Sequence, residues 1–482
     1  MKKNILVIWT WYHARRIYIP YLMENKNNFN NIIWFDLLSQ KWIISRYLNK
    51  KWYLDFKIEY LDDKSKDKDL KVKSIIESIL QEFDINMVII STEPLYHNIY
   101  ANIILENNIS IMLDKPITLE KNVINTPLIA DKILFDYNII CSNFFKKAKN
   151  INWLQFDIMA QRRYHKWYRI ALEKIKEIFK LINCPITSIN SFHNDWQWRF
   201  PDEIIDQNYH PYNQWYWKLW HSWFHTIDIV NWFIKNTSLW NKKIIEAEVI
   251  SFANFPNDLI SQFNYDDYEN LFPWFKEQSK YSQKEFLKES VNFWDVDSSS
   301  IIKYKNKDWI QTIASINLWH NWFWQRSWLT AKWRDLYKWN WRIRQEFLMI
   351  EQWPFQSILI ETFQSKEINK ENKNLYSFWG EQHFDIHVFR NSELFKNFKS
   401  YEKITSKDLY KNIWEGYSRW HNEEARRKGV KYFINNIENK NSYKKSLSNI
   451  LDHDFSTKIF VSICKSIANQ KVWKNPIINI KL

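Results

Sequence analysis

Six residues near the start of the chain stand where a phosphate-binding turn would lie. The apolar run at 4–8 predicts a buried parallel strand, and residues 15–22 have helical spacing. With glycine at positions 9 and 11 the segment between them would read G-x-G-x-x-A, in which the glycines allow a tight turn and close approach of a pyrophosphate. The phosphates would then lie at a helix N-terminus, which favours negative charge. The six residues are Trp9, Thr10, Trp11, Tyr12, His13 and Ala14.

Tryptophan stands in this sequence where turn chemistry asks for glycine. The chain has 482 residues but 3 glycines and 30 tryptophans, whereas glycine usually makes up about 7% of residues. Asp308-Trp309, Asn340-Trp341 and Trp379-Gly380 lie where Asp-Gly, Asn-Gly or Gly-Gly would make tight turns. We therefore infer that UGA codons read as glycine have been translated as tryptophan, although the apolar surroundings of Trp232 and Trp319 suit genuine indoles. A Trp-rich carbohydrate-binding protein is the alternative.

A carboxylate follows the second strand at the position of a ribose ligand. Residues 31–35 are strand-like and lead to Asp36, about 20 residues beyond the turn, where an acidic side chain binds the ribose hydroxyls of a dinucleotide. No arginine follows Asp36 directly, which favours NAD over NADP but leaves NADP open. A strand, turn and helix without a cofactor is the other interpretation of these residues.

Alternating strands and helices continue this pattern. Helices are predicted at 71–83 and 96–107, and strands at 85–91 and 109–113, which indicates a doubly wound parallel sheet. We expect an α/β protein with a Rossmann domain at 1–140 and an α+β domain at 141–482, with an insertion at 256–300. In the second domain the expected strands are 185–193, 243–253, 299–305, 310–317 and 343–361, and the expected helices are 168–182, 221–235, 421–437 and 455–468.

Composition argues against several other classes of protein. The formal net charge is +14, but the basic residues are dispersed and form no nucleic-acid module, so no nucleic-acid partner is expected. The sequence contains no run of eighteen apolar residues, so no membrane span is predicted. Cys141, Cys184 and Cys464 are too far apart for a disulfide framework or a zinc knuckle, and the cytoplasm is the expected compartment.

Two further segments resemble the Gfo/Idh/MocA oxidoreductases, relatives of glucose-fructose oxidoreductase and inositol dehydrogenase. Residues 88–97 (Val-Ile-Ile-Ser-Thr-Glu-Pro-Leu-Tyr-His) are similar to that family's T-P-x-x-x-H segment, with Glu93 inserted between Thr92 and Pro94. Asp114-Lys115-Pro116 is similar to its E-K-P segment. The resemblance implies a cis peptide at Pro116 that aims Lys115 at the nicotinamide, and a second domain with a large, open, mostly antiparallel sheet.

Residues 219–232 carry the second resemblance, to the family's D-x-x-x-H-x-x-D segment. His225 and Asp228 match, whereas His221 replaces the usual aspartate. Helical spacing places the three on one face, which suits a shared pocket. The resemblance gives Lys115 the task of stabilising charge on a substrate oxygen and His225 that of general base. Asp228 would orient its neighbours, and His221 would help to bind substrate.

Together these residues predict an NAD(P)-dependent dehydrogenase that acts on a sugar, cyclitol or related small molecule, assembled as a homo-dimer or homo-tetramer. The alternatives are a non-catalytic NAD-binding sensor or scaffold, and a relative that uses tightly bound NAD for chemistry without net redox change. Residues 161–165 are expected to form a solvated basic turn, and contact with a substrate anion or phosphate is the alternative. His383, Asp385 and His387 are expected to share one strand face, where lining the substrate site is favoured over binding a metal, and no metal is predicted. Expected cofactor-binding residues are Trp9, Thr10, Trp11, Tyr12, His13, Ala14, Asp36, Thr92, Glu93, His97, Asp114, Lys115 and Pro116.

Overall fold

The chain forms two compact units, each with its own sheet. The computed structural model describes residues 3–10, 12–51, 53, 57–62, 68–194, 199–206, 212, 224–309, 311–319, 343–365, 374–410 and 421–482. The first unit is Met1–Glu120, Lys132–Lys166 and His421–Asp454, and the second is Lys121–Asp131, Trp167–Trp420 and Phe455–Leu482. The first unit therefore extends past the boundary expected at residue 140, because a sixth strand and a distant C-terminal helix pack into it.

The first unit contains a six-stranded parallel sheet of order β3-β2-β1-β4-β5-β6, the doubly wound sheet expected from the alternating elements. Because chain order reverses between β1 and β4, the loops after these two strands flank a topological switch point, where α/β sheets bind ligands. The strands are β1 Lys3–Ile8, β2 Phe29–Leu37, β3 Lys57–Leu61, β4 Met87–Ile90, β5 Ser110–Leu113 and β6 Phe156–Ile158.

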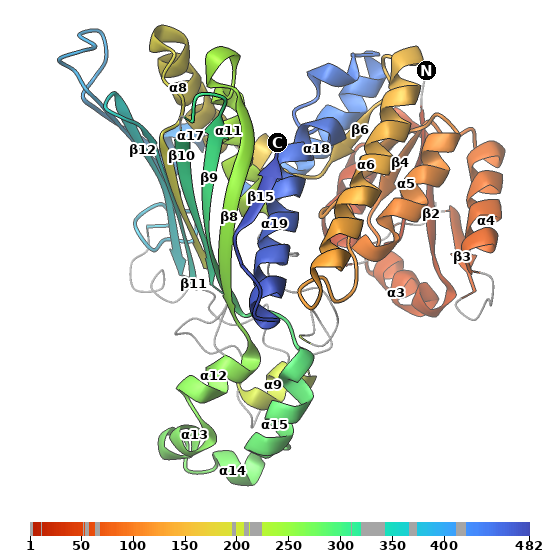
Figure 1. Cartoon of the computed structure of the whole chain (residues 1–482). Helices are drawn as coiled ribbons and strands as arrows, with labels where there is room; N and C mark the ends of the chain where they lie inside the picture. The colour runs from red at the N-terminus through yellow and green to blue at the C-terminus, as the bar shows by residue number, and fades with distance from the viewer. Residues whose placement is uncertain are drawn as a thin grey trace. The chain divides into compact units, whose positions relative to one another are not determined.

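Helices lie on both faces of this sheet (Figure 1). On one face, side chains such as Leu22, Phe433 and Ile437 pack with Val7 and Trp34 of the sheet. The C-terminal helix α18 thus completes a core begun by the first forty residues. The helices are α1 Tyr12–Arg16, α2 Tyr18–Glu24, α3 Lys41–Lys51, α4 Lys68–Glu82, α5 His97–Glu106, α6 Pro127–Asn150, α7 Gln161–Tyr164 and α18 His421–Glu438.

The expectation of a solvated basic turn at 161–165 is wrong. All five residues are buried, and Arg163 is 0% exposed. The Arg163 guanidinium donates a hydrogen bond of 3.2 Å to Nδ1 of His453. Sequence spacing shows charge but not cover, and the cover here comes from α18, which contacts α7.

The second unit contains a nine-stranded sheet of order β14-β13-β12-β11-β7-β10-β9-β8-β15. All its neighbouring strands are antiparallel except the parallel pair β7 and β10, so the sheet is mostly antiparallel, as the resemblance implied. The strands are β7 Ser188–Asn194, β8 Ile244–Asn254, β9 Asp297–Asn306, β10 Gln311–Trp319, β11 Ile343–Gln352, β12 Gln356–Ser365, β13 Asp385–Arg390, β14 Tyr401–Thr405 and β15 Ile478–Lys481.

The single strand expected at 343–361 is wrong. Residues 343–365 form a hairpin, in which β11 pairs with β12 from Ile343↔Ser365 to Gln352↔Gln356. Pro354 lies in the connecting turn, where its missing N–H costs no ladder hydrogen bond. The prediction failed because two strands with the same alternation of apolar and polar residues, joined by a short turn, look like one strand in the sequence.

One face of this sheet is covered by three helices, α8 Lys166–Ile182, α11 Phe224–Thr237 and α19 Asp454–Lys471. Tyr304 of β9 donates a hydrogen bond to Asn231 of α11, and the Ser466 hydroxyl of α19 accepts one from Ser251 N–H of β8. Side chains of the opposite face remain partly exposed, including Ile301 at 50% and Ile313 at 48%.

Residues 256–292, within the segment expected as an insertion, form a small helical layer between β8 and β9, whereas 297–300 belong to β9. Its aromatic core includes Phe200, Tyr268 and Phe275. No helix in the described part of the chain is long and apolar enough to cross a membrane. The helices here are α9 Pro201–Asp206, α12 Pro256–Gln262, α13 Tyr265–Leu271, α14 Phe275–Gln278 and α15 Gln283–Glu289, and α17 Ser406–Tyr410 follows β14.

Tryptophan supplies half of the left-handed residues. Ten of the described non-glycine residues have positive φ. Five of them are tryptophans, and the other five are Asp84, Asn108, Asn122, Asn183 and Lys440. Asparagine and aspartate tolerate this region, but a bulky side chain there is an outlier. Position 341 lies outside the described residues. The five tryptophans are Trp9 (φ 64°), Trp240 (52°), Trp309 (62°), Trp379 (68°) and Trp473 (55°).

Candidate functional site

The turn after β1 has the backbone that a phosphate-binding turn needs at its first position. Trp9 follows the last residue of β1 with φ 64°, and its N–H donates to the carbonyl of Phe35 at 2.7 Å. Helix α1 then begins at Tyr12, and Ala14 is fully buried between helix and sheet. Trp11 lies outside the described residues.

The indole of Trp9 occupies the space beside this turn. It is 6% exposed, and its Nε1 donates a hydrogen bond of 3.1 Å to the hydroxyl of Tyr100 on α5. The ring of Tyr96 lies 6.1 Å away between centroids. A glycine at position 9 would keep the backbone conformation and remove the indole ring. The main chain of this turn therefore suits a pyrophosphate, whereas the Trp9 indole takes up space beside it.

Asp36 is bound to the turn itself. Its Oδ2 accepts hydrogen bonds from the N–H of Thr10 at 2.7 Å and from the Thr10 hydroxyl at 2.5 Å. Burial raises the pKa of Asp36, and the two bonds from Thr10 partly oppose that rise. Asp36, which is predicted to bind the ribose hydroxyls, therefore contacts the predicted phosphate-binding turn, and its carboxylate stabilises that turn.

His97 joins the loops that follow β4 and β5. Its Nδ1 lies 2.8 Å from the carbonyl oxygen of Pro116, and its Nε2 lies 3.2 Å from that of Thr92. The imidazole is 0% exposed, and burial lowers its pKa. Its neutral form favours a positioning role. The Lys115–Pro116 peptide held by this contact is cis, as the resemblance implied.

Asp114 is held by two hydrogen bonds at the end of β5. Its Oδ2 accepts from the Ser91 hydroxyl at 3.2 Å, and its Oδ1 accepts from the N–H of Lys115 at 3.2 Å. Burial alone would raise the pKa of Asp114, but His13, Lys115 and His97 lower it overall. Asp114 therefore remains an anion beside Lys115, whose side chain is half-buried.

The first unit brings toward Asp114 one expected residue, His13, and two that the sequence did not identify, Tyr18 and Arg426. His13 Nε2 lies 4.0 Å from Asp114 Oδ2, and burial lowers the His13 pKa more than Asp114 raises it. Burial raises the pKa of Tyr18, and the nearby charge of Asp114 raises it further. Arg426 of α18 interacts electrostatically with both, and burial lowers its pKa to about 10, so it stays charged at neutral pH. No local pattern could have revealed Arg426, because it lies more than 300 residues away in sequence.

The second unit carries the other expected catalytic residues. His225 and Asp228 lie in the first two turns of α11 and are 6% and 1% exposed. Asp228 Oδ1 accepts a hydrogen bond of 2.8 Å from the Ser456 hydroxyl of α19. His221 lies outside the described residues. Lys115 belongs to the first unit.

A buried ionic cluster lies on the covered face of the large sheet. Glu346 of β11 accepts hydrogen bonds from Tyr168 at 2.6 Å and from Arg344 at 2.8 Å, and its Oε2 lies 3.0 Å from Nδ1 of His193. These four side chains come from α8, β7 and β11. The alternation of β11 could have placed Arg344 and Glu346 on one face, but their partners come from other elements.

Comparison with proteins of known structure identifies the fold. No family model and no curated protein matches the chain. An oxidoreductase domain protein from Kribbella flavida is similar with a TM-score of 0.58 at 10% identity, covering 100% of this chain and 99% of that one. Scyllo-inositol dehydrogenase from Lactobacillus casei, solved with NAD(H) and scyllo-inositol, has a TM-score of 0.53 at 14% identity, covering 100% and 99%.

Levoglucosan dehydrogenase in complex with NADH and levoglucosan is similar in the same way, with a TM-score of 0.54 at 11% identity and coverage of 100% and 99%. These structures are of the Gfo/Idh/MocA type, and the chain shares their fold: a Rossmann-like parallel sheet in one unit and a mixed, mostly antiparallel sheet in the other.

Proposed function

We propose that this chain is an NAD-dependent oxidoreductase that transfers a hydride between the nicotinamide and a hydroxyl or keto carbon of a sugar, cyclitol or related small molecule. One observation carries the proposal. The Asp114-Lys115-Pro116 loop after β5 is tied by His97 to the loop after β4, which flanks the switch point of a parallel sheet whose β1 turn has positive φ. Dinucleotides bind at this place in α/β sheets.

The proposal includes the glycine interpretation of the β1 turn. We infer that positions 9 and 11 are glycine in the protein as the source organism makes it. The left-handed backbone at Trp9, shared with four other tryptophans, supports this. The N–H groups at the start of α1 would hold the pyrophosphate. The Asp36 carboxylate behind them would disfavour the extra phosphate of NADP, so NAD is the proposed cofactor.

The reaction needs a hydride acceptor, an oxygen-binding group and a proton acceptor. NAD supplies the first when it is bound. Lys115 would donate a hydrogen bond to the reacting substrate oxygen, and its charge would stabilise an alkoxide there. An imidazole nitrogen of His225 would take the hydroxyl proton. Asp114 would pair as an anion with the charge of Lys115, and Asp228 would orient His225 from the next turn of α11.

The open face of the large sheet supports assembly into a homo-dimer or homo-tetramer. Phe192 packs between Phe347 and Trp319, at centroid distances of 5.3 and 5.1 Å, and Ile313 and Met349 are 48% and 39% exposed. An apolar area of this kind on one sheet face favours association. Light scattering on the purified protein tests it, since Ile313→Lys should lower the molar mass to that of the monomer.

Two measurements test the function. Peptide mass spectrometry across residues 4–15 of the native protein should show glycine at 9 and 11, and tryptophan there would remove the basis of the cofactor assignment. NAD binding by calorimetry should then be paired with turnover on a panel of sugars and polyols. Tight NAD binding without turnover on any substrate would support the sensor or scaffold alternative and refute the enzyme.

A further inference from the structure

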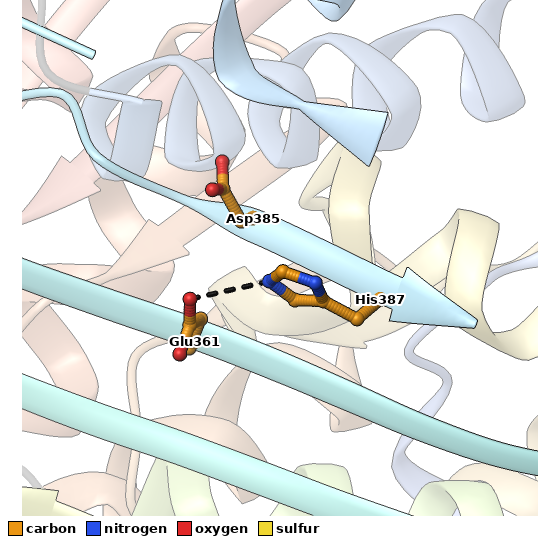
Figure 2. A group of neighbouring side chains, drawn as sticks. All are labelled: Glu361, Asp385 and His387. Atoms are coloured by element: carbon orange, nitrogen blue, oxygen red, sulfur yellow. Dashed lines mark hydrogen bonds and ion pairs between the residues drawn. The ribbon is translucent and has the colours of Figure 1, made fainter. Parts of the chain in front are cut away.

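Three side chains with metal-binding chemistry meet on the second unit's sheet, and none of them is among the residues assigned to the reaction. Glu361 of β12 pairs in register with Asp385 of β13, and His387 follows two residues later on the same face. One ligand atom from each lies within 4.8 Å of the other two. Figure 2 shows the three side chains and the contact between His387 and Glu361.

The contact between His387 and Glu361 has the spacing of two ligands on one ion. Nε2 of His387 lies 3.2 Å from Oε1 of Glu361. Two ligand atoms at about 2.0–2.1 Å from a tetrahedral Zn²⁺ are about 3.3 Å apart. Nδ1 of His387 lies 2.9 Å from the hydroxyl of Tyr401 on β14, a partner that can accept its proton and leave Nε2 free for a cation.

Asp385 offers one oxygen that nothing else uses. Nδ1 of His383 accepts a hydrogen bond of 2.9 Å from the N–H of Phe363, so its proton is on Nε2, which lies 3.3 Å from Asp385 Oδ2. Lys403 binds the same Oδ2 at 2.8 Å. Oδ1 is buried without a hydrogen-bond partner, and the side chain is 5% exposed. A buried carboxylate oxygen without a partner costs stability, which a bound cation would recover.

The charges around the cluster permit a cation. Lys403 offsets one of the two carboxylates, which leaves one negative charge when His387 is neutral. The Lys403 ammonium is bound to Oδ2 and is 43% exposed, so it can stay there or withdraw into solvent while Oδ1 binds an ion.

We propose that Glu361, Asp385 and His387 form a site for a divalent transition-metal ion such as Zn²⁺, which would tie β12 to β13. Two carboxylates and one imidazole suit zinc better than magnesium, which prefers an all-oxygen, octahedral shell. The site departs from the expectation that no metal is bound. It does not depend on the proposed redox function, because no NAD, Lys115 or His225 takes part in it.

Zn²⁺ binding to chelator-treated, full-length protein tests the site. Competition with a chromophoric chelator should give one zinc per chain, and zinc should raise the unfolding temperature by mass action. Glu361→Gln and His387→Ala should each weaken zinc binding at least tenfold and abolish the thermal shift. Glu402→Gln is the control, because it removes a carboxylate of β14 that pairs with Lys174 and takes no part in the site. It should leave the zinc affinity and the thermal shift unchanged.

Tyr401→Phe supplies a variant that keeps all three ligands and the ring. Loss of the Nδ1 partner should weaken zinc binding by about 10–100-fold. The proposal is overturned if the wild-type protein binds no stoichiometric zinc, or if Glu361→Gln and Tyr401→Phe bind it as tightly as the Glu402→Gln control. Glu361→Gln and Tyr401→Phe change few contacts, so they report on the site even if His387→Ala does not fold.

Discussion

Exchange of tryptophan for glycine should stabilise the chain where φ is positive and the indole is exposed, and destabilise it where the indole is buried in a helix. Trp473 gives the clearest case, because its side chain is 97% exposed and contributes almost no burial. It follows the end of α19 with φ 55°. Its N–H donates to the carbonyl of Gln470 at 3.1 Å, and the N–H of Lys474 donates to that of Asn469 at 2.8 Å. These two bonds define a Schellman cap, whose left-handed position is usually glycine.

The expected gain follows from two opposing effects. A left-handed conformation costs an L-residue roughly 1–2 kcal/mol. Glycine relieves that cost but makes the unfolded chain more flexible, which takes back about 0.4–1 kcal/mol. Trp473→Gly should therefore raise the free energy of unfolding by about 1 kcal/mol. Trp309→Gly should behave alike, since Trp309 is 69% exposed and ends the β9–β10 turn at φ 62°.

Trp232 is the matched control within the same unit. It lies inside α11 and is 9% exposed. Trp232→Gly should lower the free energy of unfolding by about 4–6 kcal/mol, because a glycine inside a helix costs about 1 kcal/mol and loss of a buried indole costs about 3–5 kcal/mol. Urea unfolding of the printed sequence and each variant would measure the three values.

Trp473→Ala separates the backbone effect from removal of an exposed indole. Alanine at φ 55° keeps the strained conformation, so it should not reproduce the gain seen with glycine. If Trp473→Gly and Trp309→Gly are destabilising, or if Trp473→Ala stabilises as much as Trp473→Gly, the argument from backbone geometry is wrong.

Three further outcomes are expected. Lys115→Ala should reduce kcat/KM about 10²–10⁴-fold with NAD affinity changed less than about threefold, and unchanged turnover would exclude Lys115 from the reaction. Glu346→Ala should lower the free energy of unfolding by about 3–5 kcal/mol, because it removes the negative charge that pairs with buried Arg344; Glu346→Gln removes the same charge but keeps the shape, so it should cost nearly as much, and a much smaller loss would contradict a charge effect. Burial raises the pKa of Asp157 to about 7, so folding favours its protonated form. The free energy of unfolding should therefore decrease by up to ~4 kcal/mol as the pH rises from about 4 to 7. Asp157→Asn should flatten that slope in pH-dependent unfolding, whereas an unchanged slope would assign it to other groups.

The sequence by itself determined the features that depend on neighbours along the chain. The period of apolar residues predicted the strands β1, β2, β4 and β5 and the helices α2, α4 and α5, since each is decided by a few consecutive residues, whereas α3 and β3 were not predicted. The Asp-Gly type of turn at 308–309 was predicted for the same reason, and β9 and β10 meet there. The Asp114-Lys115-Pro116 segment is recognisable because its residues are contiguous.

Only the tertiary structure decided the features that join distant segments. Helix α18 covers the first sheet and brings Arg426 toward Asp114, and no local period marks that contact. The same helix buries the basic segment at 161–165 that its composition placed in solvent. Burial and pairing arise when elements far apart in sequence pack together, and they set the charge state of a side chain. Local spacing therefore identified Asp114 and Lys115, but the packed structure decides that Asp114 remains an anion beside Lys115.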